Sequence, residues 1–141
     1  SEAIASNLAL MSQLRTRIII VITGEGGSGG ALALGVGDHV SMLEHAIYSV
    51  ASPEACASIV WRSSDKAEDA ADAMKLTSKD LIKLKIIDEV IEEPIGGAHR
   101  DYKTISSHVK QSLLSNIENL NKISLEKLLD RRYSRLTEVG R

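Results

Sequence analysis

Aromatic side chains are nearly absent from this chain of 141 residues. They make up 3% of it, and there is no phenylalanine. A core built from this sequence must therefore be aliphatic and rely on small residues. The single cysteine, Cys56, excludes an intramolecular disulfide and offers no metal-ligand pattern, so no metal site is expected and a reducing compartment is the default.

Strong charge of one sign and long apolar runs are missing as well. A formal net charge of −2 excludes a global field that would attract nucleic acid or an anionic membrane surface. The longest apolar run, residues 18–22, is far too short to cross a bilayer, and no secretory signal peptide is recognisable. The length allows at most one ordinary domain. Because the first residue is Ser1 rather than Met and a predicted helix is already under way there, we expect a piece of a longer protein.

What the chain does have is a glycine-rich stretch, Thr23-Gly24-Glu25-Gly26-Gly27-Ser28-Gly29-Gly30-Ala31. It follows a β-branched run and precedes small residues, which predicts a strand, a glycine loop and the first turn of a helix. Glycine loses much conformational entropy on folding, so a simple turn would not need so many. Backbone N–H groups at a helix start can bind an anion or a polarised carbonyl oxygen. We interpret the loop as such a site; a tightly packed strand-to-helix crossover is the alternative.

Outside the loop, the patterning predicts an α/β unit followed by helices. Apolar spacing predicts a first helix over residues 2–14, and apolar runs predict strands over 18–22, 39–43, 46–50 and 86–91. Helices are expected over 53–61, 66–74 and 79–84, with Ser52, Asp65 and Thr77 or Ser78 as N-caps. A boundary at 94–100 separates a first domain, residues 1–100, from a helical extension, residues 101–141. The extension should contain helices over 104–119 and 125–136, the latter capped by Ser124.

The apolar stripe of the first of these helices consists of Ile105, Val109, Leu113, Ile117 and Leu120. This stripe predicts a buried face. That face could pack on a second subunit or fold back on its own domain, and the sequence leaves both open.

Side chains that could carry chemistry are few. The four histidines are too scattered for a metal cluster, although His99, beside Arg100 and after two glycines, could contact a ligand or hold a turn. Cys56 is best interpreted as a buried core residue. The basic patch at 131–135 could bind a phosphate or an acidic partner, or simply be a solvated helix end. Asp88-Glu89 and Glu92-Glu93 are expected to be solvated, so no paired carboxylates are placed for acid–base work.

A dinucleotide-binding fingerprint is the main rival interpretation of the loop. Gly24-x-Gly26-x-x-Gly29 follows a predicted strand, and Glu44 lies at about the expected distance beyond it. The next helix, however, ends within about two turns, shorter than a crossover in that fold normally is. A phosphate-binding Walker loop is excluded, because no Gly-Lys-Ser/Thr follows. The sequence thus offers backbone amides and no convincing catalytic side chain, which suits oxyanion stabilisation with the reacting group on a partner.

Several longer segments, collinear over the whole chain, carry a resemblance: Ser1-Glu2-Ala3-Ile4-Ala5, Gly24 to Ala33, Tyr48-Ser49-Val50, Ser52-Pro53-Glu54, Cys56-Ala57-Ser58-Ile59, Gly96-Gly97-Ala98-His99-Arg100 and Arg131-Arg132-Tyr133. In these the chain closely resembles the C-terminal part of the alpha subunits of acetyl-CoA carboxylase carboxyltransferases of the multi-subunit type. One departure is Ala55, where that family usually has glycine.

The resemblance implies an α/β fold of crotonase-like (ClpP/crotonase) type, a partial spiral of ββα units with a C-terminal helical extension. It implies transfer of the carboxyl group from carboxybiotin on a carrier protein to acetyl-CoA, giving malonyl-CoA, the committed step of fatty acid biosynthesis. Biotin and acetyl-CoA would be the cofactor and substrate. The oxyanion hole for the biotin ureido oxygen is carried onto Gly29 and Gly30 as catalytic residues, with Gly26, Gly27, Gly29 and Gly30 forming the cofactor-binding loop.

The same resemblance implies partners and a compartment. A beta subunit in an alpha2beta2 complex would supply the enolate site and a zinc finger, alongside a biotin carboxyl carrier protein and an ATP-binding biotin carboxylase. The location would be the bacterial cytoplasm or the plastid stroma, without membrane or nucleic acid. We expect this chain to be inactive alone. The alternatives are a stand-alone crotonase-type acyl-CoA hydratase or isomerase, and a Rossmann-type dinucleotide-binding module.

Overall fold

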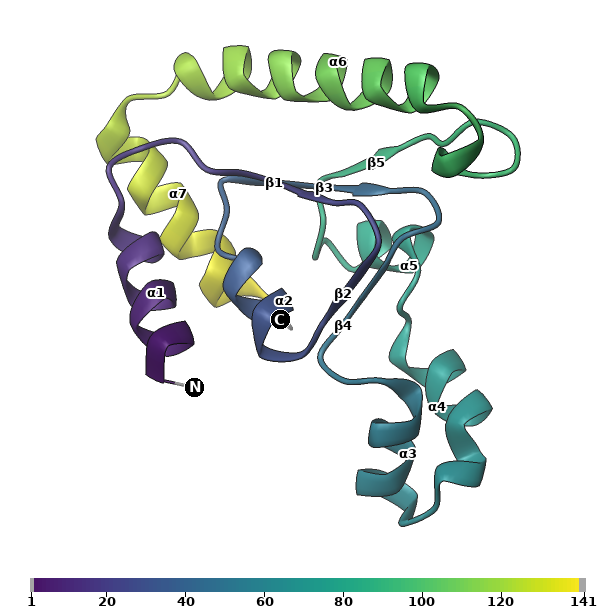
Figure 1. Ribbon diagram of the computed structural model, residues 1–141. Helices are drawn as coiled ribbons and strands as arrows, with labels where there is room; N and C mark the ends of the chain where they lie inside the picture. Colours follow the sequence, from purple (N-terminus) through teal and green to yellow (C-terminus); the bar gives the residue numbers. More distant parts are fainter. Residues whose placement is uncertain (1, 140–141) are drawn as a thin grey trace.

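Two successive ββα units form the centre of the molecule (Figure 1). The structure, a computed structural model, describes residues 2–139, with the backbone alone for residues 32–34. The first unit comprises β1 (Ile19–Ile22), β2 (Glu25–Gly27) and α2 (Ser28–Leu34). The second comprises β3 (His39–Leu43), β4 (Ile47–Ser49) and α3 (Pro53–Trp61). The predicted strand over 39–43 is confirmed at both ends.

Equivalent strands of the two units lie side by side. The first strands pair in parallel with each other and with β5 (Glu89–Ile91), in the order β1-β3-β5, while β2 and β4 form a separate parallel pair. Each of the two ββα units therefore adds one strand to each sheet, which is the arrangement of a spiral. β2 was not predicted, because three residues with two glycines carry no strand pattern. The strand predicted over 86–91 is shorter at its start.

The core lies on the three-stranded sheet. Its buried members come from β1, β3, β5, α5 (Ser78–Lys83), α6 (Tyr102–Asn121) and the connections just before β4 and β5, and all are aliphatic: Ile22, Val40, Met42, Leu43, Ala46, Leu81, Ile87, Ile91 and Ile105. Parallel strands covered on both faces read as continuous apolar runs, as β1 and β3 do. The aliphatic core expected from the lack of aromatics is confirmed.

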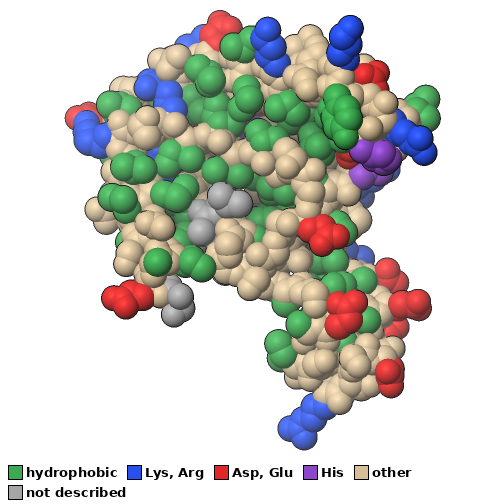
Figure 2. Space-filling model, in the orientation of Figure 1, with side chains coloured by type: hydrophobic (Ala, Val, Ile, Leu, Met, Phe, Trp, Pro, Cys, Tyr) green, Lys and Arg blue, Asp and Glu red, His purple; other side chains and the backbone are tan. Residues whose placement is uncertain are grey.

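The remaining helices frame this core. In Figure 1, α6 runs along the top of the sheet, and α7 (Leu125–Glu138) descends beside α1 (Glu2–Gln13). A lobe stands apart below, formed by α3, the 3-10 turn η1 (Ser64–Lys66) and α4 (Ala67–Met74) (Figures 1 and 2). Ala57 and Ala70 are fully buried between its helices, so close alanine packing holds the lobe together. None of the described helices is long and apolar enough to cross a membrane.

Helix starts follow the sequence closely. Ser52, Thr77 and Ser124 cap α3, α5 and α7, each accepting a backbone N–H of the first turn, as predicted. The predicted cap Asp65 is wrong. Ser63 caps η1 instead, and α4 begins without a side-chain cap because η1 runs directly into it.

The predicted apolar stripe of α6 is only partly buried. Ile105 and Leu120 are buried, but Ile117 is 44% exposed, while Ser112 and Asn116 lie inward. A helix has 3.6 residues per turn, so one face cannot follow the predicted spacing of four throughout. Between the buried residues 105 and 120, the inward positions are 112 and 116 rather than 113 and 117. α6 therefore packs on the sheet of its own chain and faces a polar cluster at its middle. The division into 1–100 and 101–141 stays a prediction.

Candidate functional site

The glycine-rich stretch folds into β2 and the first turn of α2. Gly26 and Gly27 lie in β2, opposite Tyr48 and Ser49 of β4. Gly29 and Gly30 lie in the first turn of α2, where backbone N–H groups have no partner four residues earlier in the helix. Gly29 is half-buried and Gly30 is exposed. The predicted strand, loop and helix start are thus confirmed, with part of the loop recruited into a sheet.

At most of these glycines, neither the neighbouring atoms of the chain nor the backbone conformation requires glycine. A Cβ at Gly24, Gly27 or Gly30 would meet no described atom within 4 Å, and one at Gly29 would meet only Ile4 Cδ1, at an ordinary 3.8 Å. None of them has a positive φ, since the positive-φ glycines of the described chain are at 96 and 97. Glycine costs about 1 kcal/mol relative to alanine inside a helix. Gly29 and Gly30 therefore weaken α2 while leaving space beside its backbone that no described atom fills closely.

Gly26 differs from its neighbours. A Cβ there would lie 3.1 Å from Cδ2 of Tyr48, closer than side chains normally approach. The Tyr48 ring occupies the place of the missing side chain. The close-packing interpretation of the loop thus holds for Gly26, and the ligand-site interpretation remains for Gly27, Gly29 and Gly30.

Strain marks the start of α2. Ser28 has φ of 60°, in the left-handed region that costs a non-glycine residue about 1–2 kcal/mol. Residues held in such conformations cluster at ligand sites, where the surrounding structure fixes them. The backbone therefore turns sharply at Ser28 to present the next two amides at the head of the helix.

A largely apolar cavity of about 520 Å³ adjoins α2. Its lining includes Ala31 from α2, Gly35 directly after it, Tyr48 from β4, and Arg135 and Leu136 from α7. Burial raises the pKa of the Tyr48 phenol, and the nearby charge of Arg135 offsets this only in part. The phenol is therefore neutral near pH 7, and it donates a hydrogen bond to the carbonyl oxygen of Ala31 at 2.9 Å. The volume is in the range of small-molecule pockets.

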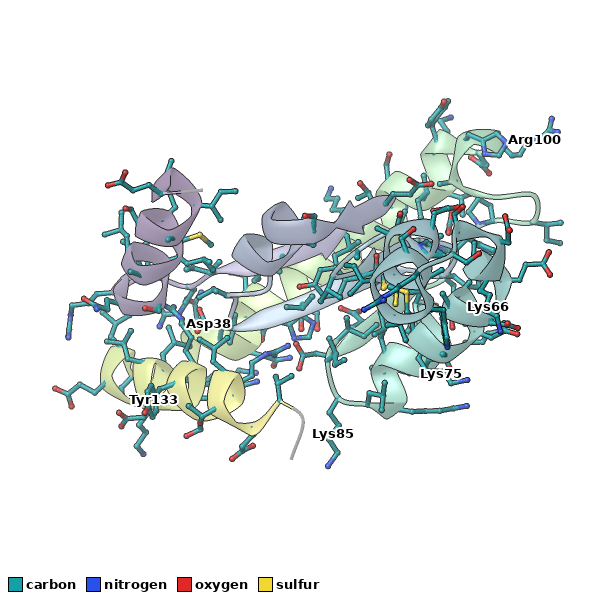
Figure 3. The ribbon with its side chains drawn as sticks, turned by 90° about the horizontal axis from the view of Figure 1, so that it is seen from below. Asp38, Lys66, Lys75, Lys85, Arg100 and Tyr133 are labelled. Atoms are coloured by element: carbon teal, nitrogen blue, oxygen red, sulfur yellow. The ribbon has the colours of Figure 1, made fainter. Side chains whose placement is uncertain are left out.

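The basic patch at 131–135 is neither free nor simply solvated. Arg132 is 1% exposed, and its guanidinium binds both carboxylate oxygens of Asp38, at 2.9 and 2.7 Å. It also donates to the carbonyls of Met11, Leu14 and Thr16. Figure 3 shows Asp38 between α1 and α7, with Tyr133 on the outer side of α7. The prediction of a solvated helix end, or of a phosphate site, is therefore wrong for Arg132, which joins α7 to the end of α1.

Asp88 and Glu89 both bond to neighbouring elements of the chain. Asp88 accepts the backbone N–H of Val40 at 2.7 Å and pairs with Arg135. One oxygen of Glu89 accepts hydrogen bonds from four side chains: Ser41, Ser112, Asn116 and His39. Alternating sequence patterns do not reveal such a network, because its donors come from β3 and α6. The expectation of solvation is wrong for Glu89, which is half-buried and ties α6 to the sheet; Asp88 is exposed, as expected, although it also bonds to β3 and α7.

The Glu89 network predicts a pH dependence of stability. Burial alone would raise the pKa of Glu89, but its four hydrogen bonds outweigh burial and hold the pKa below the ordinary 4.5. A lowered pKa means stabilisation that is present above pH 4.5 and lost as the pH falls through the folded-state pKa. Urea unfolding of wild type and Glu89→Gln between pH 7 and 3 should show a flatter acid limb for the variant. Glu92→Gln, at an exposed neighbour, is the control; parallel acid limbs for wild type and Glu89→Gln would contradict the assignment.

Glu93 is also buried rather than solvated. Its side chain is 6% exposed and accepts the backbone N–H groups of His45 and Ala98 at 2.7 and 2.8 Å. Gly96 and Gly97 have φ of 91° and 97°, so the segment before η2 (Ala98–Arg100) turns as only glycine readily allows. This favours the turn interpretation of His99 and Arg100, whose side chains are exposed (Figure 3 labels Arg100).

Other candidates contribute no site. Cys56 is a free, half-buried thiol in α3 rather than a fully buried core residue. No group of three or more His, Cys, Asp or Glu side chains in the described chain is arranged to hold a metal ion. Glu44, the acidic residue of the dinucleotide fingerprint, receives the backbone N–H of Glu93 at 3.4 Å, and α2 is 7 residues long. Both observations disfavour dinucleotide binding.

Comparison with protein families gives one match over residues 1–140, to "Acetyl co-enzyme A carboxylase carboxyltransferase-like" proteins. Among curated relatives, the acetyl-coenzyme A carboxylase carboxyl transferase subunit alpha of Vibrio campbellii is 57% identical over 140 residues. The same subunit of Histophilus somni (strain 129Pt) is 56% identical over 140 residues. In both cases the match covers 99% of this chain and 44% of the relative. The chain thus spans less than half the length of the curated relatives it matches.

Solved structures agree on the fold. An enoyl-CoA hydratase/isomerase from Marinobacter aquaeolei matches 99% of this chain and 51% of its own, with a TM-score of 0.59 and 16% identity. A Pseudomonas malonate decarboxylase hetero-tetramer gives 0.58 at 19% identity, over 66% and 39% of the two chains. The transcarboxylase 12S hexamer gives 0.56 at 21% identity, over 78% and 22%. The predicted crotonase-like fold is confirmed, and a Rossmann-type module is excluded.

Proposed function

Because this chain belongs to the family of acetyl-CoA carboxylase carboxyltransferase alpha subunits, we propose that it forms part of a carboxyltransferase that converts acetyl-CoA to malonyl-CoA. The carboxyl donor is carboxybiotin on a carrier protein. The amides of Gly29 and Gly30 bind the ureido oxygen, with Gly26 and Gly27 shaping the same loop. The activity belongs to the longer protein, and this chain alone is expected to be inactive.

The open space beside the glycines carries the proposal. A ligand oxygen can approach the amides of Gly29 and Gly30 closely only if no side chain stands there, and Gly30 leaves that space empty. A pre-formed pair of N–H donors costs no reorganisation when negative charge develops on the bound oxygen. The two N–H donors lie between Ser28, whose backbone is in the left-handed region, and Ala31, which is buried.

Carboxybiotin, when bound, supplies the carboxyl group. The residues of this chain bind its ureido oxygen, orient the ring by that contact, and stabilise the negative charge that remains when the carboxyl group leaves. The adjoining cavity is largely apolar, with Ala31 and Leu136 in its lining, so it would present few polar groups to a ligand bound on that side of α2. No side chain of this chain is needed as a base in this scheme.

The partners follow from the family as part of the proposal. A beta subunit carrying the zinc finger and the site for the acetyl-CoA enolate would face Gly29 and Gly30 in an alpha2beta2 complex. A biotin carboxyl carrier protein and a biotin carboxylase would complete the system, in the bacterial cytoplasm or the plastid stroma. A stand-alone hydratase would need a carboxylate in the site, and the described lining of the cavity beside α2 contains none.

Reconstitution with omissions tests this function. The complete alpha subunit that contains this chain is mixed with the beta subunit, carboxylated carrier protein and acetyl-CoA, and malonyl-CoA is measured. We expect product only when all are present, and none when the 141-residue chain replaces the complete subunit. Hydration of an enoyl-CoA without a biotinylated carrier would instead support the hydratase alternative. Product from the 141 residues alone would contradict the expected inactivity.

A further inference from the structure

Tyr48 touches the proposed oxyanion site from two sides. It lies opposite Gly26 in the β2–β4 pair, where its ring edge occupies the space of a Cβ at 3.1 Å. Its hydroxyl crosses to α2 and donates to the carbonyl of Ala31 at 2.9 Å. One side chain thus contacts the strand that enters the site and the helix that presents its donors.

The helix needs such a contact. α2 has 7 residues, two of them glycines in its first turn, and it begins at a strained serine. Short helices with glycine are unstable without tertiary support. Within the described part of the chain, no other side chain hydrogen-bonds to α2. The Ala31 carbonyl also accepts the N–H of Gly35 at 3.0 Å, so the phenol binds the helix without opening it.

We propose that Tyr48 is a positioning residue that holds the amides of Gly29 and Gly30 in place through its hydrogen bond to Ala31. This inference rests on the proposed function. Ala31 follows Gly30 directly, so a shift of its carbonyl moves both donors. Because its ring fills the space beside Gly26 as well, Tyr48 fixes α2 relative to β2, and not only relative to β4.

Tyr48→Phe in the complete alpha subunit, reconstituted with beta, tests the role. The variant keeps the ring against Gly26 and removes only the hydroxyl. We expect kcat for malonyl-CoA formation to fall about 10- to 100-fold, because small misplacements of oriented groups cost that much, while KM for acetyl-CoA stays within about twofold. Tyr102→Phe is the matched control, since Tyr102 is 73% exposed at the start of α6, and it should leave both constants unchanged.

Hydrogen exchange of the same proteins measures how well the backbone amides around the site are protected, independently of catalysis. In Tyr48→Phe, peptides covering residues 24–35 should exchange faster, while peptides from β3 and the midpoint of thermal unfolding should stay as in wild type. Adding Tyr48→Phe to a Gly30→Val subunit should lower kcat no further, because both changes act on the same donors.

The outcomes separate the two claims. Wild-type kcat in Tyr48→Phe, or faster exchange without a loss of kcat, would overturn the positioning role while the proposed function stands. A wild-type complex that makes no malonyl-CoA would overturn the proposed function, and the positioning role with it. A fall in kcat together with a matching fall in the unfolding midpoint would show a structural role and would overturn the proposal as well.

Discussion

Replacing Arg132 by alanine should destabilise the complete subunit by about 3–5 kcal/mol, the usual cost of breaking a buried ion pair by removing one partner. The guanidinium makes five hydrogen bonds, two to Asp38 and three to backbone carbonyls. Without it, the Asp38 carboxylate, 2% exposed, would lose its ion-pair partner and keep only the backbone N–H of Ile18 as a hydrogen-bond donor. The carbonyls at the end of α1 would lose their donor as well. Urea unfolding, followed by circular dichroism, measures the change.

Arg131→Ala is the control for this prediction. Arg131 is exposed on the same helix, so its loss should change the free energy of unfolding by less than about 0.5 kcal/mol. Arg132→Lys should recover only part of the stability, because an ammonium has three donors and no planar fork. A loss below about 1 kcal/mol for Arg132→Ala would show that the ion pair forms without stabilising the fold.

Arg132 also shows why the sequence misled at this point. A cluster such as Arg131-Arg132-Tyr133-Ser134-Arg135 is normally a solvated surface, and no local pattern distinguishes its second arginine from the others. Its partner Asp38 lies 94 residues away, just before β3. Burial of a charge is decided by the pairing of distant elements, which local periodicity does not record.

Features that depend on contacts between residues near in sequence were predicted correctly. The β-branched run before the glycines gave β1, and Ser52, Thr77 and Ser124 marked helix starts through contacts within one turn. The spiral of ββα units was expected only from the family resemblance, and the parallel pairing of β1 with β3 and of β2 with β4 was not predicted, since no residue pattern specifies which strands are neighbours. β2 escaped prediction because glycine has no strand preference of its own.

The candidate site divides in the same way. Glycine composition predicted an open backbone at the start of α2, and the empty space at Gly27 and Gly30 agrees with it. Gly26 makes room for the ring of Tyr48, and this contact depends on the strand register, which places residue 26 opposite residue 48. A glycine can therefore be needed for a ligand or for a neighbouring side chain, and only the three-dimensional contact distinguishes the two.

Gly30→Val should abolish most of the carboxyl transfer without weakening the fold. A Cβ at this position meets no described atom within 4 Å, and φ is not positive, so the chain itself has room for the larger side chain. Valine is also favoured over glycine inside a helix by a few tenths of a kcal/mol. The thermal midpoint of the complete subunit should therefore be unchanged or slightly higher, and assembly with the beta subunit should be retained.

The loss of activity should be large because valine fills the space that the ligand oxygen needs in order to reach the amides of Gly29 and Gly30. Removing one donor of an oxyanion hole typically lowers kcat by about 10²–10³, equivalent to about 3–4 kcal/mol. Gly24→Val is the matched control, because a Cβ at Gly24 is equally unhindered but lies before β2, away from the helix start. Malonyl-CoA formation by the reconstituted complex should be near wild type for Gly24→Val and nearly absent for Gly30→Val. Equal rates for the two variants would mean that the open space beside α2 serves no ligand, because a stable fold with a blocked helix start would then still transfer the carboxyl group.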